Sequence, residues 1–167
     1  MLVIGARDGV CRSKKCGNNG EQISPAIQAE LKHVESIAID PKNPDVVYAG
    51  TWHLAWKTDD SGASWHRINK GMIDDSDVFS VIVDSTNPAV VYASACSGIY
   101  KSDSAGDLFR KMQGIPFSAR RTRVLRQDPN NPGTVYAGTT EGLWKTADAG
   151  KSWKRVSNPE IVVNDVL

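Results

Sequence analysis

Acidic side chains are the first candidates for chemistry in this sequence. Glycoside hydrolysis requires two carboxyl groups that flank a sugar bond, about 5 to 10 Å apart. Four carboxylates could supply such a pair, and they are Asp74, Asp75, Asp77 and Glu141. A solvated acidic loop explains the run at 74–77 equally well, so we keep these residues as candidates and assign no catalytic residue.

Aromatic and basic side chains are candidates for binding. Trp52 either stacks on a sugar ring or fills a gap near the centre of the fold. Arginines form one short cluster, which includes Arg123. A guanidinium binds carboxylates and other anions through paired hydrogen bonds, although a structural ion pair would explain Arg126 as well. The candidate binding residues are Trp52, His53, Arg120, Arg121 and Arg126.

Metal-ligating residues are too scattered to predict a metal site or a cofactor. The three histidines fall on different expected elements without metal-ligand spacing, at His33, His53 and His66. Three cysteines cannot all pair within one chain, and they are Cys11, Cys16 and Cys96. A bridge between the first two is possible, but isolated thiols that behave as small apolar residues explain the pattern more simply.

The balance of charges narrows the class of partner. The 167 residues include 20 Lys or Arg and 19 Asp or Glu, which leaves a net charge of +1. Nucleic-acid-binding domains carry a basic excess, and a membrane span needs about 18 consecutive apolar residues. We therefore expect no nucleic-acid partner and no membrane-spanning segment. The sequence assigns no compartment, although an extracytoplasmic parent protein would be compatible with it.

The elements that position these residues follow from an internal repeat. Residues 34–68, 78–112 and 122–156 align without gaps at a spacing of 44. A weaker copy at 4–13 aligns with 137–146, so the chain opens within a repeat. We predict one propeller portion over 1–167, divided into an incomplete blade with a helical insert at 1–33 and three blades at 34–77, 78–121 and 122–165.

Each repeat predicts four short strands rather than helices. Apolar alternation, turns rich in Pro and Asn, and strands rich in Val, Tyr and Trp recur at regular spacing. The expected fold is an all-β propeller, partial or small, with about three and a half to four four-stranded blades. The exception is 24–32, where Ser24 can cap a short helix with Pro25 in its first turn.

One hairpin motif carries a family resemblance. Ser/Thr-x-Asp-x-Gly-x-Ser-Trp occurs in two copies, as Thr58, Asp60, Gly62, Ser64 and Trp65, and as Thr146, Asp148, Gly150, Ser152 and Trp153. The middle copy keeps Gly106 and has Phe109 in the Trp position. The motif resembles the Asp-box, or BNR repeat, of sialidase-like, sortilin-like and xyloglucanase propellers and of the photosystem II assembly factor. The resemblance implies a fold but no reaction, and we interpret the box as a turn-closing and packing motif.

Strand direction separates the repeated turns from the variable loops. The repeated turns should emerge on one face of the propeller, and the variable loops with the candidate site residues on the other. We expect a non-catalytic binding or scaffold module that presents this variable face to a protein or glycan partner. The first alternative is a fragment of a xyloglucanase-like or sialidase-like glycoside hydrolase whose cleft is shared with missing blades. The second is an assembly factor whose arginine cluster docks an acidic partner.

Closure of the ring is a separate question. The end of the chain supplies only the start of a further first strand, so a closed four-bladed ring would be poorly completed. An open arc leaves strand edges unpaired, which favours a homodimer or a larger parent propeller of six to eight blades.

Overall fold

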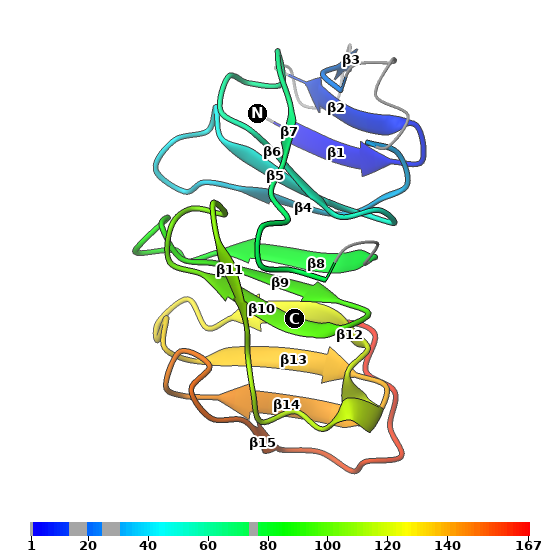
Figure 1. Ribbon diagram of the computed structural model, residues 1–167, viewed down its shortest axis with the longest axis vertical. Coiled ribbons are helices and arrows are strands. Elements are labelled where there is room, and N and C mark those ends of the chain that lie inside the picture. Colours follow the sequence, from blue (N-terminus) through cyan, green and yellow to red (C-terminus); the bar gives the residue numbers. More distant parts are fainter. Residues whose placement is uncertain (1, 14–19, 25–30, 74–76) are drawn as a thin grey trace.

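The structure is a computed structural model that describes residues 2–13, 20–24, 31–73 and 77–167. It consists of four antiparallel sheets, which follow one another along the molecule (Figure 1). The first sheet contains β1 (Leu2–Ala6), β2 (Gly9–Ser13) and β3 (Glu21–Gln22), and the second contains β4 (Val34–Ile39), β5 (Val47–Thr51), β6 (Ala55–Thr58) and β7 (His66–Arg67). The third contains β8 (Val78–Val83), β9 (Val91–Ala95), β10 (Gly98–Ser102) and β11 (Phe109–Lys111), and the fourth contains β12 (Thr122–Gln127), β13 (Val135–Thr139), β14 (Gly142–Thr146) and β15 (Lys154–Arg155).

Strand order is the same in every sheet, because each strand pairs with the one before it. The first strands of the three complete sheets begin 44 residues apart, at Val34, Val78 and Thr122. The strands β1 and β2 align in the repeat with β13 and β14, so the first sheet holds the second, third and fourth strands of a blade. The expectation of an all-β fold is confirmed.

The core lies in layers between neighbouring sheets. The middle strands β5 and β9 are buried along their whole length, because a sheet packs against each of their faces. One cluster, with Val10, Trp56 and Trp65, joins the first two sheets. A second cluster, with Tyr48 and Phe109, joins the second sheet to the third. A third joins the last two sheets and includes Tyr92, Ile99, Trp144 and Trp153.

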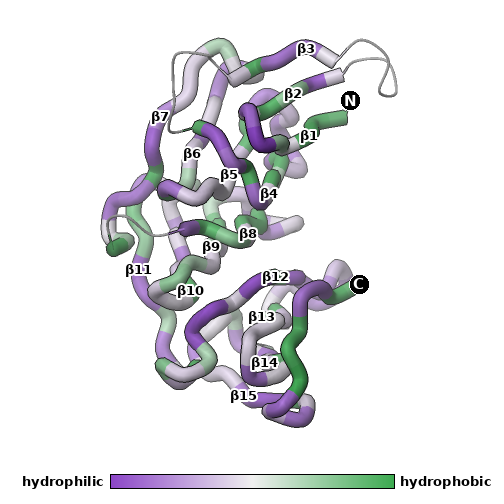
Figure 2. The backbone as a smooth tube through the Cα atoms, turned by 90° about the vertical axis from the view of Figure 1, so that its right-hand side faces the viewer, coloured by the Kyte–Doolittle hydropathy of each residue, from purple (hydrophilic) through white to green (hydrophobic). Residues whose placement is uncertain are grey.

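The sheets form an open arc. Figures 1 and 2 place the first and last sheets at opposite ends of the long axis, so these two sheets do not meet. The first strands β4, β8 and β12 lie next to one another on one side of the arc, with β7 and β11 on the other side (Figure 2). A ring of four blades is therefore not closed by the described residues.

Serine side chains join the first strands across the sheets. The Ser36 hydroxyl accepts a hydrogen bond from the backbone N–H of Val81 at 2.9 Å, and the Ser80 hydroxyl accepts one from that of Leu125 at 3.1 Å. The two serines occupy the same position of the repeat, 44 residues apart. These bonds fix how far each sheet slides along its neighbour.

Helical structure is confined to one short turn in the described part of the chain, the 3-10 helix η1 (Phe117–Ala119). The helix expected at 24–32 falls on residues 25–30, which lie outside the described residues. Its flanking residues Ser24 and Leu31 are buried. No helix among the described residues is long and apolar enough to cross a membrane.

Candidate functional site

The Asp-box hairpins occupy the edge of the arc where the repeated turns lie. The Asp60 carboxylate accepts hydrogen bonds from the Ser64 backbone N–H at 2.8 Å, the Ser64 hydroxyl at 2.6 Å and the Thr58 hydroxyl at 2.7 Å. Asp148 makes the same three bonds, with Ser152 and Thr146. Hydrogen bonds from Ser64, above all from its hydroxyl, lower the pKa of Asp60 to about 2. The Asp60 carboxylate therefore stabilises its own turn.

The middle copy closes its turn with a serine instead of an aspartate. The Ser104 hydroxyl accepts a hydrogen bond from the Leu108 N–H at 3.2 Å, the role that Asp60 has in the preceding sheet. Asp103, one position earlier, does not take over this role, because it pairs with Lys101 at 3.2 Å. The hairpin thus survives the loss of the carboxylate.

The same hairpins pack on the preceding sheet. Gly62 has φ +94°, and a Cβ at this position would lie 2.6 Å from Cβ of Ile23. The indole N–H of Trp65 donates to the Ile23 carbonyl at 2.9 Å. Both contacts join the second sheet to the first, so the motif acts here in turn closure and packing.

The variable edge carries a hollow of about 310 Å³, which we call the inner hollow. It brings together side chains from the β5–β6 turn, the β9–β10 turn and the starts of β8 and β12. Its lining residues are Trp52, Asp77, Phe79, Cys96, Arg121 and Arg123. Three of these were expected at the site from the sequence, namely Trp52, Asp77 and Arg121.

Bulges in the first strands direct side chains toward this hollow. The register of each first strand shifts at the same repeat position, between Val34 and Ser36 and at the two equivalent places. The residues at these bulges are Glu35, Phe79 and Arg123. A bulge turns a side chain away from the regular alternation and is common beside functional sites. Sequence reasoning missed Phe79 and Arg123 in this role, because a bulge depends on the partner strand.

Trp52 is a fixed, exposed aromatic surface. Its side chain is 55% exposed, so it does not fill a gap in the packing. The His33 ring stacks on it with centroids 4.3 Å apart and an interplanar angle of 11°. Its indole N–H donates to the Glu35 carboxylate at 2.5 Å. His53 follows Trp52 in the same turn, where its backbone N–H donates to the Thr51 hydroxyl at 3.0 Å.

Asp77 is tied to a neighbouring thiol. The Cys96 thiol donates to an Asp77 carboxylate oxygen at 3.6 Å, and the Cys96 backbone N–H donates to the Asp77 carbonyl at 3.1 Å. Burial, reinforced by the Asp77 charge, raises the pKa of the Cys96 thiol, so the thiol stays protonated. The neighbouring candidates Asp74 and Asp75 lie outside the described residues.

Cys11 and Cys16 are the two thiols for which a disulfide bridge was considered. Cys11 is a free thiol, so the structure contains no bridge at this residue. Cys16 lies outside the described residues.

The arginine cluster is divided among three places. Arg121 and Arg123 line the inner hollow, and within the described ranges neither pairs with a carboxylate. Arg120 lies over the Phe117 ring, 3.8 Å from its centroid, at the outer rim. Arg126 donates to the Val166 carbonyl at 2.9 Å and approaches Asp165 at 3.9 Å, so it is held by the C-terminal segment.

The candidate acids are likewise separated. Glu141 accepts a hydrogen bond from the Ser118 hydroxyl at 3.1 Å, which holds it beside η1. Asp77 is the only carboxylate among the described residues that line the inner hollow. In this hollow the described residues therefore do not assemble the facing pair of acids that glycoside hydrolysis needs.

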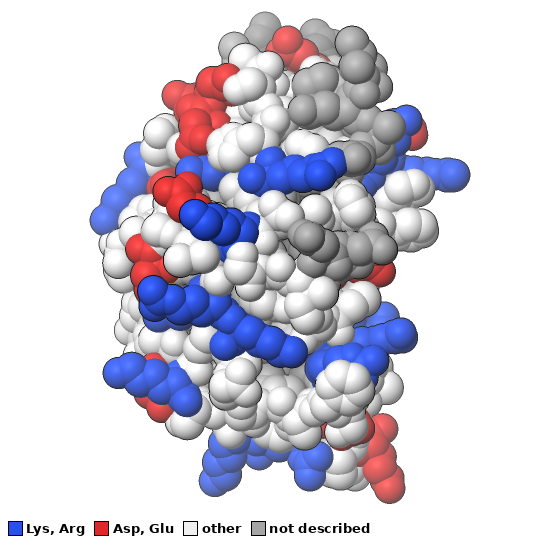
Figure 3. All heavy atoms as spheres, in the orientation of Figure 1, with Lys and Arg blue, Asp and Glu red and all other residues white. Residues whose placement is uncertain are grey.

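Charge is unevenly spread over the surface. Figure 3 shows Lys and Arg across the face in view, whereas Asp and Glu gather mainly along the left edge, where Figure 1 places the repeated turns. Among the residues that the structure describes, no group of three potential metal ligands comes together.

Comparison with known proteins identifies the fold. No protein-family model matches the sequence, and no curated protein matches it. An ancestral GH74 enzyme superposes with a TM-score of 0.80 at 18% identity over 93% of this chain and 22% of that chain. The GH74 xyloglucanase from Xanthomonas campestris gives 0.73 at 17% identity, over 92% of this chain and 28% of that one.

A structure of YCF48 bound to D1 peptide gives a TM-score of 0.66 at 13% identity, over 90% of this chain and 48% of that chain. The chain thus spans between about a fifth and about a half of the length of these structures. Likeness at these identities establishes architecture only. The chain has the fold of part of an Asp-box β-propeller.

Proposed function

We propose that this chain is a non-catalytic binding or scaffold module whose inner hollow holds an acidic segment of a protein partner. One observation carries the proposal: an exposed indole, Trp52, lines the same hollow as two guanidinium groups, those of Arg121 and Arg123. Neither guanidinium has a carboxylate partner in the described part of the chain. Guanidinium groups bind carboxylates through paired hydrogen bonds, and an indole face binds the apolar part of the same segment.

Pre-organisation supports a binding role for Trp52. His33 stacks on one face of the indole and Glu35 fixes its N–H, so little side-chain freedom remains to be lost when a partner binds. The Cys96 thiol occupies part of the hydrogen-bonding capacity of Asp77, the one described acid in the hollow. The remaining charge of the lining is basic, which favours an acidic ligand. YCF48, which shares the fold, was solved with a peptide.

The proposal can be tested by fluorescence anisotropy with a labelled peptide of alternating Glu and Phe residues and its Gln-for-Glu analogue. Replacing both arginines, Arg121→Ala with Arg123→Ala, should weaken binding of the acidic peptide at least about tenfold, because two charge-assisted hydrogen-bonding groups are removed. Trp52→Ala should weaken binding of both peptides. Arg110→Ala, an exposed arginine on β11 outside the hollow, is the matched control. Equal binding of the two peptides, or no effect of the double variant, would disprove the proposal.

A second candidate is part of a glycoside hydrolase. Likeness to GH74 enzymes and the presence of Asp77 and Glu141 on the variable edge favour it. The measurement is release of reducing sugar from xyloglucan by the wild-type chain and by Asp77→Asn. Release that disappears in the variant would replace the binding proposal with a catalytic one.

A further inference from the structure

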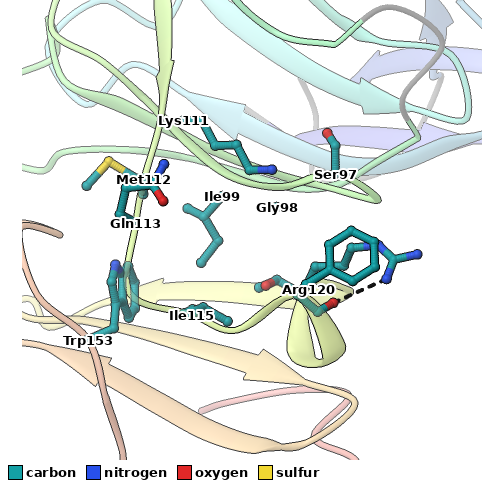
Figure 4. Close-up of a pocket in the computed structure, with 11 residues that line it drawn as sticks. Ser97, Gly98, Ile99, Lys111, Met112, Gln113, Ile115, Arg120 and Trp153 are labelled. Atoms are coloured by element: carbon teal, nitrogen blue, oxygen red, sulfur yellow. Dashed lines mark hydrogen bonds between the residues drawn. The ribbon is translucent and has the colours of Figure 1, made fainter.

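A second pocket, which we call the rim pocket, lies between the third and fourth sheets. It has a volume of about 190 Å³, and its lining includes Ile99, Lys111, Ile115, Arg120, Thr122 and Trp153. Figure 4 shows Lys111, Arg120 and Trp153 arranged around the side chains of Ile99 and Ile115. The rim pocket shares no lining residue with the inner hollow, so a ligand in it would be independent of the proposed function.

Two positively charged side chains, Lys111 and Arg120, border the rim pocket. Neither forms an ion pair with another described residue, and the described residues that line the pocket include no carboxylate. Arg120 donates to the Phe117 carbonyl at 3.2 Å, which leaves most of its N–H groups free to bind a ligand.

Comparison with the other sheets shows that Lys111 is differently placed from its counterparts. Arg67 and Arg155, at the same repeat position, lie over the Trp56 and Trp144 rings at 5.4 and 5.6 Å. In the third sheet the corresponding aromatic residue is Tyr100, whose hydroxyl bonds to Ser97. Lys111 runs beside Gly98, where a Cβ would lie 3.0 Å from its Cε, as Arg155 runs beside Gly142, but Lys111 has no aromatic ring contact among the described residues.

Two buried donors in the pocket wall have no partner among the described residues. The Thr122 hydroxyl and the Trp153 indole N–H are buried and make no hydrogen bond to any of these residues. Thr122 is fully buried and Trp153 is 9% exposed. Unpaired buried donors are destabilising and uncommon, so their presence requires an explanation.

The repeat shows that the fold does not require these donors to be unpaired. Val34 and Val78 occupy the position of Thr122 in the preceding sheets, so an apolar side chain of the same shape satisfies the packing there. Trp65, the counterpart of Trp153, donates its indole N–H to the Ile23 carbonyl at 2.9 Å. The fourth sheet therefore departs from the repeat at two positions that both line one pocket.

We propose that the rim pocket binds a carboxylate carried on a short apolar group. Thr122 and Trp153 would donate to the carboxylate oxygens, Lys111 and Arg120 would balance its charge, and Ile99 and Ile115 would contact the apolar part. The volume is below the roughly 300 Å³ at which pockets begin to hold drug-sized ligands, so one side chain or one small acid is the appropriate size. The carboxylate belongs either to a free organic acid or to the C-terminus of a peptide.

Indole N–H resonances provide a direct test. In ¹H–¹⁵N spectra of the ¹⁵N-labelled chain titrated with isovalerate, the Trp153 indole signal, assigned with Trp153→Phe, should move in a saturable way. Trp144 is the matched control, because its indole N–H is also buried without a partner among the described residues, and Trp144 does not line the pocket. Isovaleramide, which lacks the charge, should leave the Trp153 signal in place. A Trp153 signal unmoved by both isovalerate and the peptide Gly-Gly-Leu, or moved equally by the amide, would overturn the proposal.

Variants separate binding from structure. Thr122→Val restores the side chain of the other sheets, so the chain should be at least as stable, yet isovalerate affinity should fall at least about fivefold. Lys111→Met should lower the affinity similarly. Unchanged affinity in both variants would contradict the assignment. Titration with Gly-Gly-Leu, free or amidated at its C-terminus, distinguishes the two sources of the carboxylate. Tighter binding of the free-ended peptide than of isovalerate indicates a peptide C-terminus. Tighter binding of isovalerate indicates a free organic acid.

Discussion

The hydroxyl of Tyr48 donates a hydrogen bond to the backbone carbonyl of Ala105 at 3.1 Å, which joins the second sheet to the Asp-box hairpin of the third. Tyr92 repeats the contact with Ala149 at 3.3 Å, one sheet further along. Both tyrosine side chains are fully buried, and both acceptors have positive φ, 52° and 56°. The hairpin motif therefore presents a carbonyl to the preceding sheet as well as closing its own turn.

Removing the Tyr48 hydroxyl tests this contact. Tyr48→Phe should lower the free energy of unfolding by about 1 kcal/mol, because it removes the hydrogen bond that the buried Tyr48 side chain donates to the half-buried Ala105 carbonyl. Tyr136→Phe is the control, since the Tyr136 hydroxyl makes no hydrogen bond to any described residue. Urea unfolding monitored by tryptophan fluorescence measures both. Equal losses in the two variants would show that the contact contributes nothing specific.

Ionisation of the same tyrosines predicts weakening at high pH. Burial, with the charges of Asp84 and Asp103, raises the pKa of Tyr92 to about 12, and burial likewise raises the pKa of Tyr48. The unfolded chain ionises near 10, so the stabilising contribution is complete below about pH 10 and is lost as the pH rises toward 12. Urea midpoints between pH 9 and 12 should therefore fall, and more gently in Tyr92→Phe. An identical slope in that variant would refute the assignment to Tyr92.

The Asp-box carboxylates predict weakening in acid. Hydrogen bonds from Ser64 and Thr58 lower the pKa of Asp60, and those from Ser152 and Thr146 lower that of Asp148. A lowered pKa stabilises the fold above about pH 4, and the contribution is lost as the pH falls toward 2. The temperature of thermal unfolding should therefore fall between pH 5 and pH 2, and it should fall less in a variant in which Asp60 is replaced.

The choice of replacement at Asp60 can be guided by the middle repeat. Asp60→Ser retains an acceptor for the Ser64 N–H, as Ser104 does for Leu108. It should therefore destabilise the chain less at neutral pH than Asp60→Ala, which retains none. If the two variants unfold at the same temperature, the acceptor is unimportant and the serine in the middle repeat needs another explanation.

A glycine exchange tests the docking of the hairpin on the preceding sheet. Gly62→Ala should cost more than about 1 kcal/mol, because φ is +94° and the new Cβ would lie 2.6 Å from Ile23. Gly133→Ala provides the comparison, since the nearest atom to its Cβ is 3.4 Å away and its φ is not in the positive region. Chemical denaturation of the two proteins should separate them clearly. A tolerated Gly62→Ala would mean that the first sheet shifts to admit the methyl group.

The fold was predictable because the same pattern of strands and turns occurs in each repeat. The turn at Asp40, the strand at Val47–Thr51 and the hairpin at Asp60 recur at a constant spacing, so each assignment supports the others. The serine bonds across the sheets were not predicted. Their signal was present in Ser36 and Ser80, which share a position within mainly apolar first strands.

The candidate site was less predictable because it depends on contacts between sheets. Adjacency in sequence suggested one arginine cluster, yet Arg120, Arg121 and Arg126 lie in three different surroundings. The stacking of His33 on Trp52 depends on the pairing of β4 with β5, which a single strand does not show. Thr122 was detectable, since it interrupts a position otherwise held by valine.

The position of Tyr48 and Tyr92 is occupied by Val3 in the first sheet. Val3 has no hydroxyl to donate to the carbonyl of Ser61, the residue that corresponds to Ala105 and Ala149. Among the described residues the first sheet also lacks a first strand, so it has no counterpart of the serine bonds that join the later sheets, although the Trp65 indole N–H still donates to the Ile23 carbonyl. In an array whose sheets touch only their neighbours, a weak junction opens without the rest. We therefore expect amide hydrogens of β1 and β2 to exchange before those of β9, because unfolding begins with the first sheet.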